Sequence, residues 1–348
     1  MAKSTSRQAG VVKLADVARV AGVSTATVSR ALSSPEKVGA KLLARVQAAL
    51  QESGYVPHGA ARALRSRRSR TIGAVVPTLD NAIFASATHA LQKALEEKGY
   101  TLLVASHEFD LENEVRVVLP LVERGIDGLV LVGLDHAPAL FRLLRSVQLP
   151  YVLTWALDRS GELPCIGFDN HEAAVRVADY LADLGHRRVA VIGGLTSGND
   201  RARERIAGTL DALARRGAQI PPTWVLERPY SFDAAREAMR VLMRQEPRPT
   251  AVICGNDILA VGASAEARAL GLDVPGDVSI TGFDDLEISA ILEPPLTTVR
   301  VPTREIGRLA AEHLLARANG PGAQRVRKVA VELVVRRSTA PPPAGLGG

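Results

Sequence analysis

Residues 71–282 alternate between short apolar runs and longer segments with helical periodicity, and this alternation restricts the fold more than any other feature of the sequence. Seven runs are candidate strands: Thr71–Val76, Tyr100–Ser106, Gly128–Val132, Tyr151–Thr154, Arg188–Ile192, Thr250–Cys254 and Ser279–Gly282. Helical patterns fall between them, at Ala85–Lys98, Ala173–Leu184, Arg203–Arg215 and Ala234–Arg244. Most runs are continuously apolar, as expected for parallel strands buried on both faces. They predict a doubly wound α/β body. Because the strands are too many for one small sheet, we expect two lobes, and we expect the chain to pass from the first lobe to the second near residues 155–170.

The charges divide the chain at about residue 70. Residues 1–70 hold 13 Lys or Arg and 3 Asp or Glu, whereas the remainder holds 30 and 34. A basic end on an acidic body is the electrostatic pattern of a nucleic-acid-binding domain. A solvated basic tail is the alternative, but apolar periodicity runs through the same residues and argues against it.

The basic end is predicted to form three short helices. One apolar face defines the first helix through Leu14, Val17, Ala18 and Ala21. Gly22 ends this helix, and Ser24 stands at the N-cap position of a second helix, Thr25–Leu32. A third helix is expected over Lys41–Ser53. Two helices joined by a tight turn that contains glycine are typical of the helix-turn-helix motif.

Residues 57–70 have a different composition. Five arginines and no acidic residue occur between residues 59 and 70. The segment has too few apolar residues for a core of its own, so we interpret it as a linker that becomes ordered on contact with an anionic partner, DNA.

Polar residues follow the predicted strands, where open parallel sheets bind ligands. These residues are Asp80, Asn81, Arg201, Arg203, Arg205, Asn256, Asp257, Asp284 and Asp285. Asp, Asn and Arg around an aromatic side chain suit a small polyhydroxylated or anionic molecule. Each Asp or Asn can instead cap the following helix. We assign Asp257 to capping, and Arg205, Asn256 and Asp284 to ligand binding.

Catalytic motifs are not apparent. The glycine-rich run at residues 193–198 lacks both the Lys-Ser/Thr of a phosphate loop and the dinucleotide spacing, so a turn with close backbone approach is predicted. No G-x-S-x-G elbow occurs, and His186 precedes a strand at a position typical of a structural turn. The two cysteines, Cys165 and Cys254, are far apart and suggest neither a disulfide framework nor a metal site. No metal, no cofactor and no enzymatic activity are expected.

Several motifs resemble the LacI/GalR family of bacterial transcription regulators. The most specific lie in the basic end, at Leu14–Ala18 and Gly22–Arg30. Others follow in family order at Gly54–Pro57, Ala60–Leu64, Leu184–Ala190, Asn256–Gly262, Gly282–Asp285 and Pro294–Val299. The similarity spans residues 11–338, nearly the whole chain.

The resemblance implies an all-α helix-turn-helix head at residues 1–56 and a hinge helix and linker at 57–70. It implies a type I periplasmic-binding-protein-like α/β body at 71–340, made of two doubly wound parallel-sheet lobes. The N-lobe would comprise residues 71–168 and 299–320, and the C-lobe 169–298 and 321–340. The Pro/Gly-rich residues 341–348 are predicted to form a disordered tail.

For DNA binding, the resemblance implies that Thr25, Ala26 and Arg30 read bases in the major groove. A generic phosphate contact is the alternative for Arg30. Ser24, Thr27 and Ser29 are expected to contact phosphates and pack the helix. In the hinge, Leu64 matches the family's minor-groove wedge, flanked by Arg62 and Arg65; a core leucine is the alternative.

For the effector, the resemblance implies contacts from Phe84, Asp169, Arg205, Tyr230, Asn256 and Asp284. Residues 166–170 look similar to the gluconate-repressor branch, which suggests a sugar acid whose carboxylate pairs with Arg205. The same arginine also occurs in family members that bind neutral sugars, so a sugar and a sugar acid both remain open.

Together these features predict a homodimeric repressor that binds a pseudo-palindromic double-stranded DNA operator under the control of an effector between the lobes. The polar N-terminus and the lack of a long apolar run predict a cytoplasmic, nucleoid-associated protein with no membrane contact. Two alternatives from other classes are a transport-type sugar-binding protein and a nucleotide-dependent enzyme. The basic head argues against the first, and the missing phosphate loop argues against the second.

Overall fold

The computed structural model describes residues 12–56, 68–218, 220–318 and 325–343, and the chain divides after Ser69 into two units. The first unit holds the head, and the second, from Arg70 onward, holds the body. The predicted hinge residues 57–67 and the last residues of the predicted tail, 344–348, lie outside the described residues. Within the described ranges, no helix has the length and apolarity needed to span a membrane.

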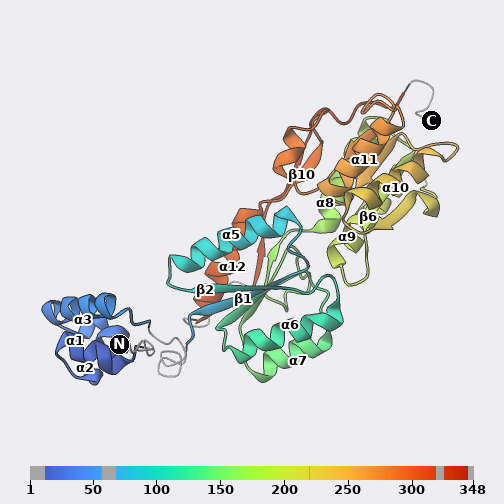
Figure 1. The fold of residues 1–348 in the computed structure, drawn as a ribbon. Coiled ribbons are helices and arrows are strands. Elements are labelled where there is room, and N and C mark those ends of the chain that lie inside the picture. The colour runs from blue at the N-terminus through green and yellow to red at the C-terminus, as the bar shows by residue number, and fades with distance from the viewer. Residues whose placement is uncertain (1–11, 57–67, 219, 319–324, 344–348) are drawn as a thin grey trace, which may run out of the picture. The chain divides into compact units, whose positions relative to one another are not determined.

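The head has the three predicted helices, drawn in blue in Figure 1. They are α1 (Leu14–Ala21), α2 (Thr25–Ser33) and α3 (Ala40–Ser53), with a short 3-10 turn at Pro35–Lys37. Gly22 ends α1 in the left-handed conformation (φ 62°), as predicted. The small core consists of Val17, Ala18, Ala21, Val28, Ala31, Val46 and Ala49.

The first lobe of the body contains a six-stranded parallel sheet in the order β11-β5-β4-β3-β1-β2. Its strands are β1 (Thr71–Val76), β2 (Thr101–Ser106), β3 (Gly128–Val132), β4 (Tyr151–Thr154), β5 (Cys165–Gly167) and β11 (Val326–Lys328). Its helices are α5 (Ala82–Glu96), α6 (Leu111–Glu123), α7 (Pro138–Ser146) and α12 (Thr303–Ala318). Figure 1 shows α5 and α12 on one face of this sheet and α6 and α7 on the other.

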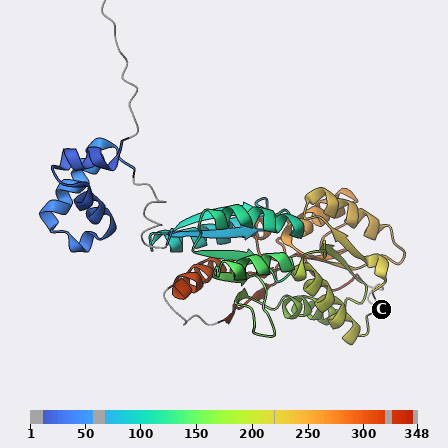
Figure 2. The same ribbon diagram turned by 90° about the horizontal axis from the view of Figure 1, so that it is seen from below.

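The second lobe contains a four-stranded parallel sheet in the order β7-β6-β8-β9. Its strands are β6 (Val189–Gly194), β7 (Val225–Arg228), β8 (Ala251–Cys254) and β9 (Ser279–Thr281). Its helices are α8 (Asn170–Asp183), α9 (Asp200–Arg215), α10 (Phe232–Met243) and α11 (Asp257–Ala269), with 3-10 turns at Pro222–Trp224 and Glu287–Ala290. Figure 2 shows the sheet between two helix pairs; α8 packs on α9, and α10 packs on α11.

The last part of the chain corrects the predicted lobe boundaries. Residues 321–340 were expected in the C-lobe, but β11 pairs with β5 in the first-lobe sheet. The three residues of β11, Val-Arg-Lys, carry no apolar run, and backbone hydrogen bonding to the edge of β5 determines where they lie. Beyond β11, β12 (Glu332–Val334) pairs antiparallel with β10 (Thr298–Arg300). The chain then reaches the second lobe, where the amide of Ile280 donates to the carbonyl of Ser338.

All seven predicted strands are present, and three of them, β1, β3 and β4, have the predicted bounds. The predicted helices 85–98, 173–184, 203–215 and 234–244 correspond to α5, α8, α9 and α10, each of which begins two or three residues earlier. Five short strands, β5, β7, β10, β11 and β12, were not predicted.

Candidate functional site

The exposed face of α2 is the first candidate site. Ser24 caps the helix, since its hydroxyl accepts a hydrogen bond from the Thr27 amide (3.1 Å) and contacts the Thr27 hydroxyl (2.9 Å). Val28 and Ala31 face the head's core, which leaves Thr25, Ala26 and Arg30 exposed on the outer surface. Ser29 and Thr27 are half-buried beside them. This arrangement presents a basic, polar helix face of the kind that enters the major groove.

The guanidinium of Arg30 has no carboxylate partner within the described part of the head. In contrast, Arg19 on α1 pairs with Asp16. An unpaired, exposed guanidinium keeps its fork of donors available for a base or a phosphate. The predicted hinge contacts of Arg62, Leu64 and Arg65 lie outside the described residues.

The second candidate site is a cavity between the two lobes of the body. Its outer part has a volume of about 310 Å³, and its deep part has about 20 Å³. Both parts share Asn81 and Phe109 from the first lobe, and Asn199 and Tyr230 from the second. Five of the six predicted effector residues line the deep part: Phe84, Arg205, Tyr230, Asn256 and Asp284.

Arg205 organises the floor of the deep part from α9. Its Nε donates to Asn170 Oδ1 (2.9 Å), and its Nη1 donates to the Gly255 carbonyl (2.8 Å). The guanidinium carbon lies 3.6 Å from the ring centroid of Phe283, a cation–π contact. Nη2 is 4.0 Å from Asp284 Oδ1. Arg205 is therefore both a buried structural group and a donor at the cavity wall.

Three buried polar atoms in the deep part lack a hydrogen-bond partner among the described residues. They are the donors Trp155 Nε1 and Asn256 Nδ2, and the acceptor Asp284 Oδ1. Trp155 comes from the first lobe, whereas Asn256 and Asp284 come from the second. Buried polar atoms without partners are uncommon, because each one forfeits its hydrogen bonds to water. Together they form a set that the hydroxyl groups of a ligand can satisfy.

Asp284 has an unusual environment. Burial raises the pKa of its carboxyl to about 8, although the charge of Arg205 opposes the shift. Its backbone also has a positive φ of 114°, which non-glycine residues rarely adopt and which is found at functional sites. Near neutral pH this carboxyl holds a proton, so one of its oxygens can donate a hydrogen bond and the other can accept one.

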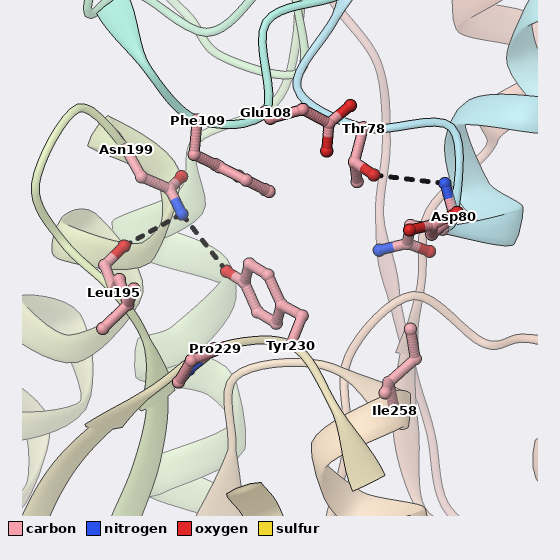
Figure 3. A pocket seen from close by; sticks show the side chains of 10 residues that line it. Thr78, Asp80, Glu108, Phe109, Leu195, Asn199, Pro229, Tyr230 and Ile258 are labelled. Atoms are coloured by element: carbon pink, nitrogen blue, oxygen red, sulfur yellow. Dashed lines mark hydrogen bonds between the residues drawn. The ribbon is translucent and has the colours of Figure 1, made fainter.

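The outer part of the cavity is mainly apolar. Figure 3 shows the rings of Phe109 and Tyr230 next to each other, with Thr78 and Asp80 across the cavity and Ile258 below. The two ring centroids are 5.9 Å apart. Tyr230 needs Gly194 at the end of β6, because a Cβ there would lie 2.2 Å from its hydroxyl. The predicted close approach is thus found at Gly194, but Gly193 and Gly194 end the strand β6 and do not form the predicted turn.

Asp169 lies apart from the other predicted effector residues. It caps α8 by accepting from the Glu172 amide (2.9 Å), and Arg159 Nη2 lies 3.1 Å from its carboxylate. It lines a separate cavity of about 330 Å³, together with Asp135 and Arg203. Its carboxylate is occupied by these two contacts, and it does not line either part of the first cavity.

The predicted roles of Asn256 and Asp257 must be revised. Asn256 caps α11, since its Oδ1 accepts from the Leu259 amide (2.9 Å), and this leaves its Nδ2 at the cavity. Asp257 was assigned to capping, but its buried carboxylate accepts from Thr298 Oγ1, Ser289 Oγ and the Leu286 amide (2.6–2.7 Å). Burial raises the pKa of Asp257 to about 6. Asp257 therefore holds together three segments of the second lobe. Asn256 has two roles, since it caps α11 and also lines the cavity.

His186 is structural, as predicted. Its ring nitrogens contact Thr250 Oγ1 (2.9 Å), Ser279 Oγ (3.2 Å) and the Ala340 carbonyl (2.9 Å), and burial lowers its pKa. Across the described parts of the chain, no group of three or more His, Cys, Asp or Glu side chains is arranged to hold a metal ion.

Sequence reasoning missed an ion-pair cluster between the lobes, formed by Asp135, Asp200, Arg201 and Arg203. Arg203 on α9 donates from two nitrogens to the two carboxylate oxygens of Asp135 in the first lobe, both at 2.9 Å. Arg201 donates to the Val132 carbonyl of the first lobe (3.3 Å) and pairs with Asp200 (2.8 Å). At Gly133 (φ 87°) a Cβ would lie 1.8 Å from Arg201 Nη1, so only glycine fits.

Phe109, Leu195 and Ile258 of the outer cavity were also missed, because apolar residues carry no motif.

Comparison with known protein families gives two matches. A family model described as "Bacterial regulatory proteins, lacI family" matches residues 13–58, which include the capped helix α2. A model of a "Periplasmic binding protein-like domain" matches residues 178–339.

Individual proteins are similar over most of the chain. The HTH-type transcriptional repressor CytR of Escherichia coli K12 is 34% identical over 338 residues, which is 96% of this chain and 98% of the relative. A lac repressor dimer solved with operator and the anti-inducer ONPF has a TM-score of 0.84 at 28% identity, covering 94% of this chain and 99% of that one. The transcription regulator GntR of Chromobacterium violaceum has a TM-score of 0.74 at 30% identity, covering 77% and 99%.

Proposed function

Because this chain belongs to the lacI family of bacterial regulatory proteins, we propose that it is a repressor whose hold on an operator depends on a small polyhydroxylated effector. The family consists of DNA-binding transcriptional regulators, so the chain is a regulator and not an enzyme.

The observation that carries operator binding is the outer face of α2. Thr25, Ala26 and Arg30 are exposed together on a helix whose first turn is capped by Ser24. Arg30 would pair with guanine through two donors, while Thr25 and Ala26 would contact thymine methyl groups. Leu64 in the hinge is expected to enter the minor groove between Arg62 and Arg65.

The observation that carries effector binding is the set of unpartnered atoms at Trp155, Asn256 and Asp284. Since these atoms come from both lobes, a ligand that bonds to all of them has a higher affinity for one arrangement of the lobes than for another. A difference in affinity between two states is what an allosteric switch requires. Phe84, Arg205 and Tyr230 complete the proposed effector site.

We extend the two-fold assembly of the matched lac repressor dimer to this chain, as a homodimer on a pseudo-palindromic operator in the cytoplasm. A dimer places two α2 helices one turn of DNA apart, which matches the symmetry of such an operator. Association with the nucleoid would follow from the basic head.

Selection of genomic fragments on the full-length protein, followed by gel shift, tests operator binding. Salt-sensitive, sequence-selective binding is expected. Arg30→Ala should weaken operator affinity about 10- to 100-fold, since a bidentate base contact contributes roughly 1–3 kcal/mol. Arg45→Ala removes the same charge from an exposed site on α3 and should have a much smaller effect on selectivity.

If no genomic fragment is bound selectively, the proposal that the protein is a repressor is refuted. Equal losses in the two variants would reassign Arg30 to a phosphate contact.

A further inference from the structure

The first lobe holds a buried cluster of three titratable side chains that do not line the effector cavity: His107, Glu114 and His136. His107 follows β2, Glu114 lies on α6, and His136 lies in the turn after β3. The residues His107 and Glu114 are 4% and 1% exposed, and the side chain of His136 is 1% exposed. Glutamate is almost never buried this completely unless it is paired. The proposed function gives none of the three side chains a role.

The pairing within this histidine–glutamate cluster is incomplete. Glu114 Oε1 lies 2.7 Å from His136 Nδ1. Glu114 Oε2 and His107 Nδ1 are buried as well, but neither has a hydrogen-bond partner among the described residues. Buried polar atoms without partners are uncommon, because burial costs them their hydrogen bonds to water. Glu114 therefore has one oxygen bonded to His136 and a second oxygen available to another donor.

The His136 side of the cluster supports the contacts between the lobes. His136 Nε2 lies 3.1 Å from the Gly133 carbonyl, across the turn that carries Asp135. Asp135 is the partner of Arg203 on α9 in the second lobe. Arg201, on the same helix, donates to a carbonyl at the end of β3, just before this turn. The bond between Glu114 and His136 thus stabilises the part of the first lobe that α9 contacts.

The His107 side of the cluster supports a wall of the effector cavity. Glu108 and Phe109 follow His107 directly and line the outer cavity (Figure 3). Both have a positive φ, 53° and 59°, which residues with a Cβ rarely adopt. The His107 amide donates to the Val76 carbonyl (3.2 Å), and its carbonyl accepts from the Asp110 amide (3.0 Å). Movement of His107 would therefore also move this wall.

His107 is largely uncharged near neutral pH. Burial lowers the pKa of its ring below the ordinary value of 6.5. Glu114 on α6 and the neighbouring Glu108 oppose this shift, whereas His136, in the turn after β3, and Arg201 on α9 reinforce it. The ring therefore gains a proton only as the pH falls below 6.5. Once charged, it is attracted by Glu114 and repelled by Arg201.

We propose that His107, Glu114 and His136 form a proton-sensitive switch, in which acidification draws the Glu114 carboxylate from His136 to His107 and loosens the contact between the lobes. The proton comes from the solvent and binds to His107, and the unpartnered Glu114 Oε2 then accepts a hydrogen bond from the ring. The turn that presents Asp135 to Arg203 loses its support. This regulation by protons goes beyond the proposed function, because it requires neither an effector nor an operator.

The fluorescence of Trp155 can report on the arrangement of the lobes, because this side chain is buried at the deep cavity, which residues of both lobes line. Trp224→Phe removes the only other tryptophan and gives the parent protein for the test. Quenching by acrylamide is measured on the full-length parent between about pH 5 and 8. Quenching should increase reversibly as the pH falls, with a midpoint below pH 6.5, because separation of the lobes exposes Trp155 to solvent.

Two variants of the parent test the cluster. His107→Gln should abolish the transition, because glutamine does not gain a proton. Glu114→Gln should move the midpoint to a lower pH, because it removes the strongest charge that favours protonation of His107. His186→Gln is the matched control and should keep the transition. His186 is also buried with a pKa lowered by burial, but its ring is bonded within the second lobe, to Thr250 and Ser279.

Constant quenching of the parent across the pH range would overturn the proposal, as would a transition that His107→Gln retains. In the second case the proton would be bound elsewhere, for example at Asp257 or Asp284, whose pKa values of about 6 and 8 lie in the same range. An unchanged midpoint in Glu114→Gln, or loss of the transition in His186→Gln, would also overturn it. Far-ultraviolet circular dichroism should stay constant through the transition, and a simultaneous loss of helical signal would reassign the transition to unfolding.

Discussion

Helix α9 contributes arginines to two polar clusters between the lobes, and the clusters differ in how completely their polar atoms are paired. Near the helix start, Arg201 and Arg203 bond directly to the first lobe at Val132 and Asp135. At the deep cavity, Arg205 bonds only within the second lobe, and the polar atoms around it lack partners. The ion-pair cluster thus links the lobes through protein contacts, whereas at the cavity the link must come from a ligand.

The first-lobe side of the ion-pair cluster is itself braced. His136, next to Asp135, contacts Glu114 Oε1 on α6 (2.7 Å) through Nδ1 and the Gly133 carbonyl (3.1 Å) through Nε2. The carbonyl can only accept, so Nε2 donates to it, and Nδ1 lies within hydrogen-bond distance of the carboxylate. Both side chains are almost fully buried. This pair holds the turn that presents Asp135 to Arg203.

The largest expected difference between the two clusters is in how much each contributes to the stability of the fold. Arg205→Ala should lower the free energy of unfolding by about 3 kcal/mol, since it leaves buried partners at Asn170 and Gly255 and a gap over Phe283. Arg203→Ala, on the same helix but half-exposed, should lower it by less than about 1 kcal/mol. Urea unfolding followed by tryptophan fluorescence measures both, because the only two tryptophans, Trp155 and Trp224, lie in the body. Equal losses would remove the contrast between the two clusters.

The second expected difference is the pH dependence of stability that Asp284 brings to the deep cavity. The folded pKa of Asp284, about 8, is above the ordinary value of 3.8. An acidic group whose pKa is raised in the folded state stabilises the fold at a pH below its unfolded pKa. This contribution is lost as the pH rises through the folded pKa. Asp284→Asn should therefore gain stability relative to the unmodified chain between pH 4 and 8. The gain should be at least about 1.4 kcal/mol, the equivalent of one pKa unit.

Urea titrations at pH 5, 6, 7 and 8 measure this difference. Asp257 is present in both proteins, but its charge also raises the pKa of Asp284, so its own titration near pH 6 contributes to the measured difference. A constant difference across the range would show that Asp284 is ionised throughout.

The sequence predicted those parts of the fold whose signal is local. β3 is a fully buried apolar run, and its predicted bounds match the structure. β7, Val-Leu-Glu-Arg, is a partly exposed edge strand, and β11 has three residues, so neither has a periodicity to detect. Only pairing across the sheet determines where such strands lie.

The candidate cavity was predictable where polar residues follow strands. Arg205, Asn256 and Asp284 were identified in this way, and they line one cavity. The unpaired state of Trp155 Nε1 could not be predicted, because it depends on the neighbours that the second lobe supplies. The Arg203–Asp135 pair joins residues 68 positions apart, and no local pattern links them.

The smallest expected effect is the most direct measure of the ion-pair cluster. A double-mutant cycle with Arg203→Ala and Asp135→Ala should give a coupling energy of about 0.5–1 kcal/mol in urea unfolding, because the pair is bidentate but half-exposed on the arginine side. The coupling should fall as salt is raised, since exposed charges are screened. Arg216, which follows α9, and Asp179 on α8 form a pair within the second lobe and supply a control cycle of similar exposure. If the cluster links the lobes, breaking Arg203–Asp135 should also change effector affinity, whereas breaking Arg216–Asp179 should not. An equal change in both cycles would mean that the cluster contributes only local stability, and the unpaired atoms of the deep cavity would then be the sole link between ligand and lobe arrangement.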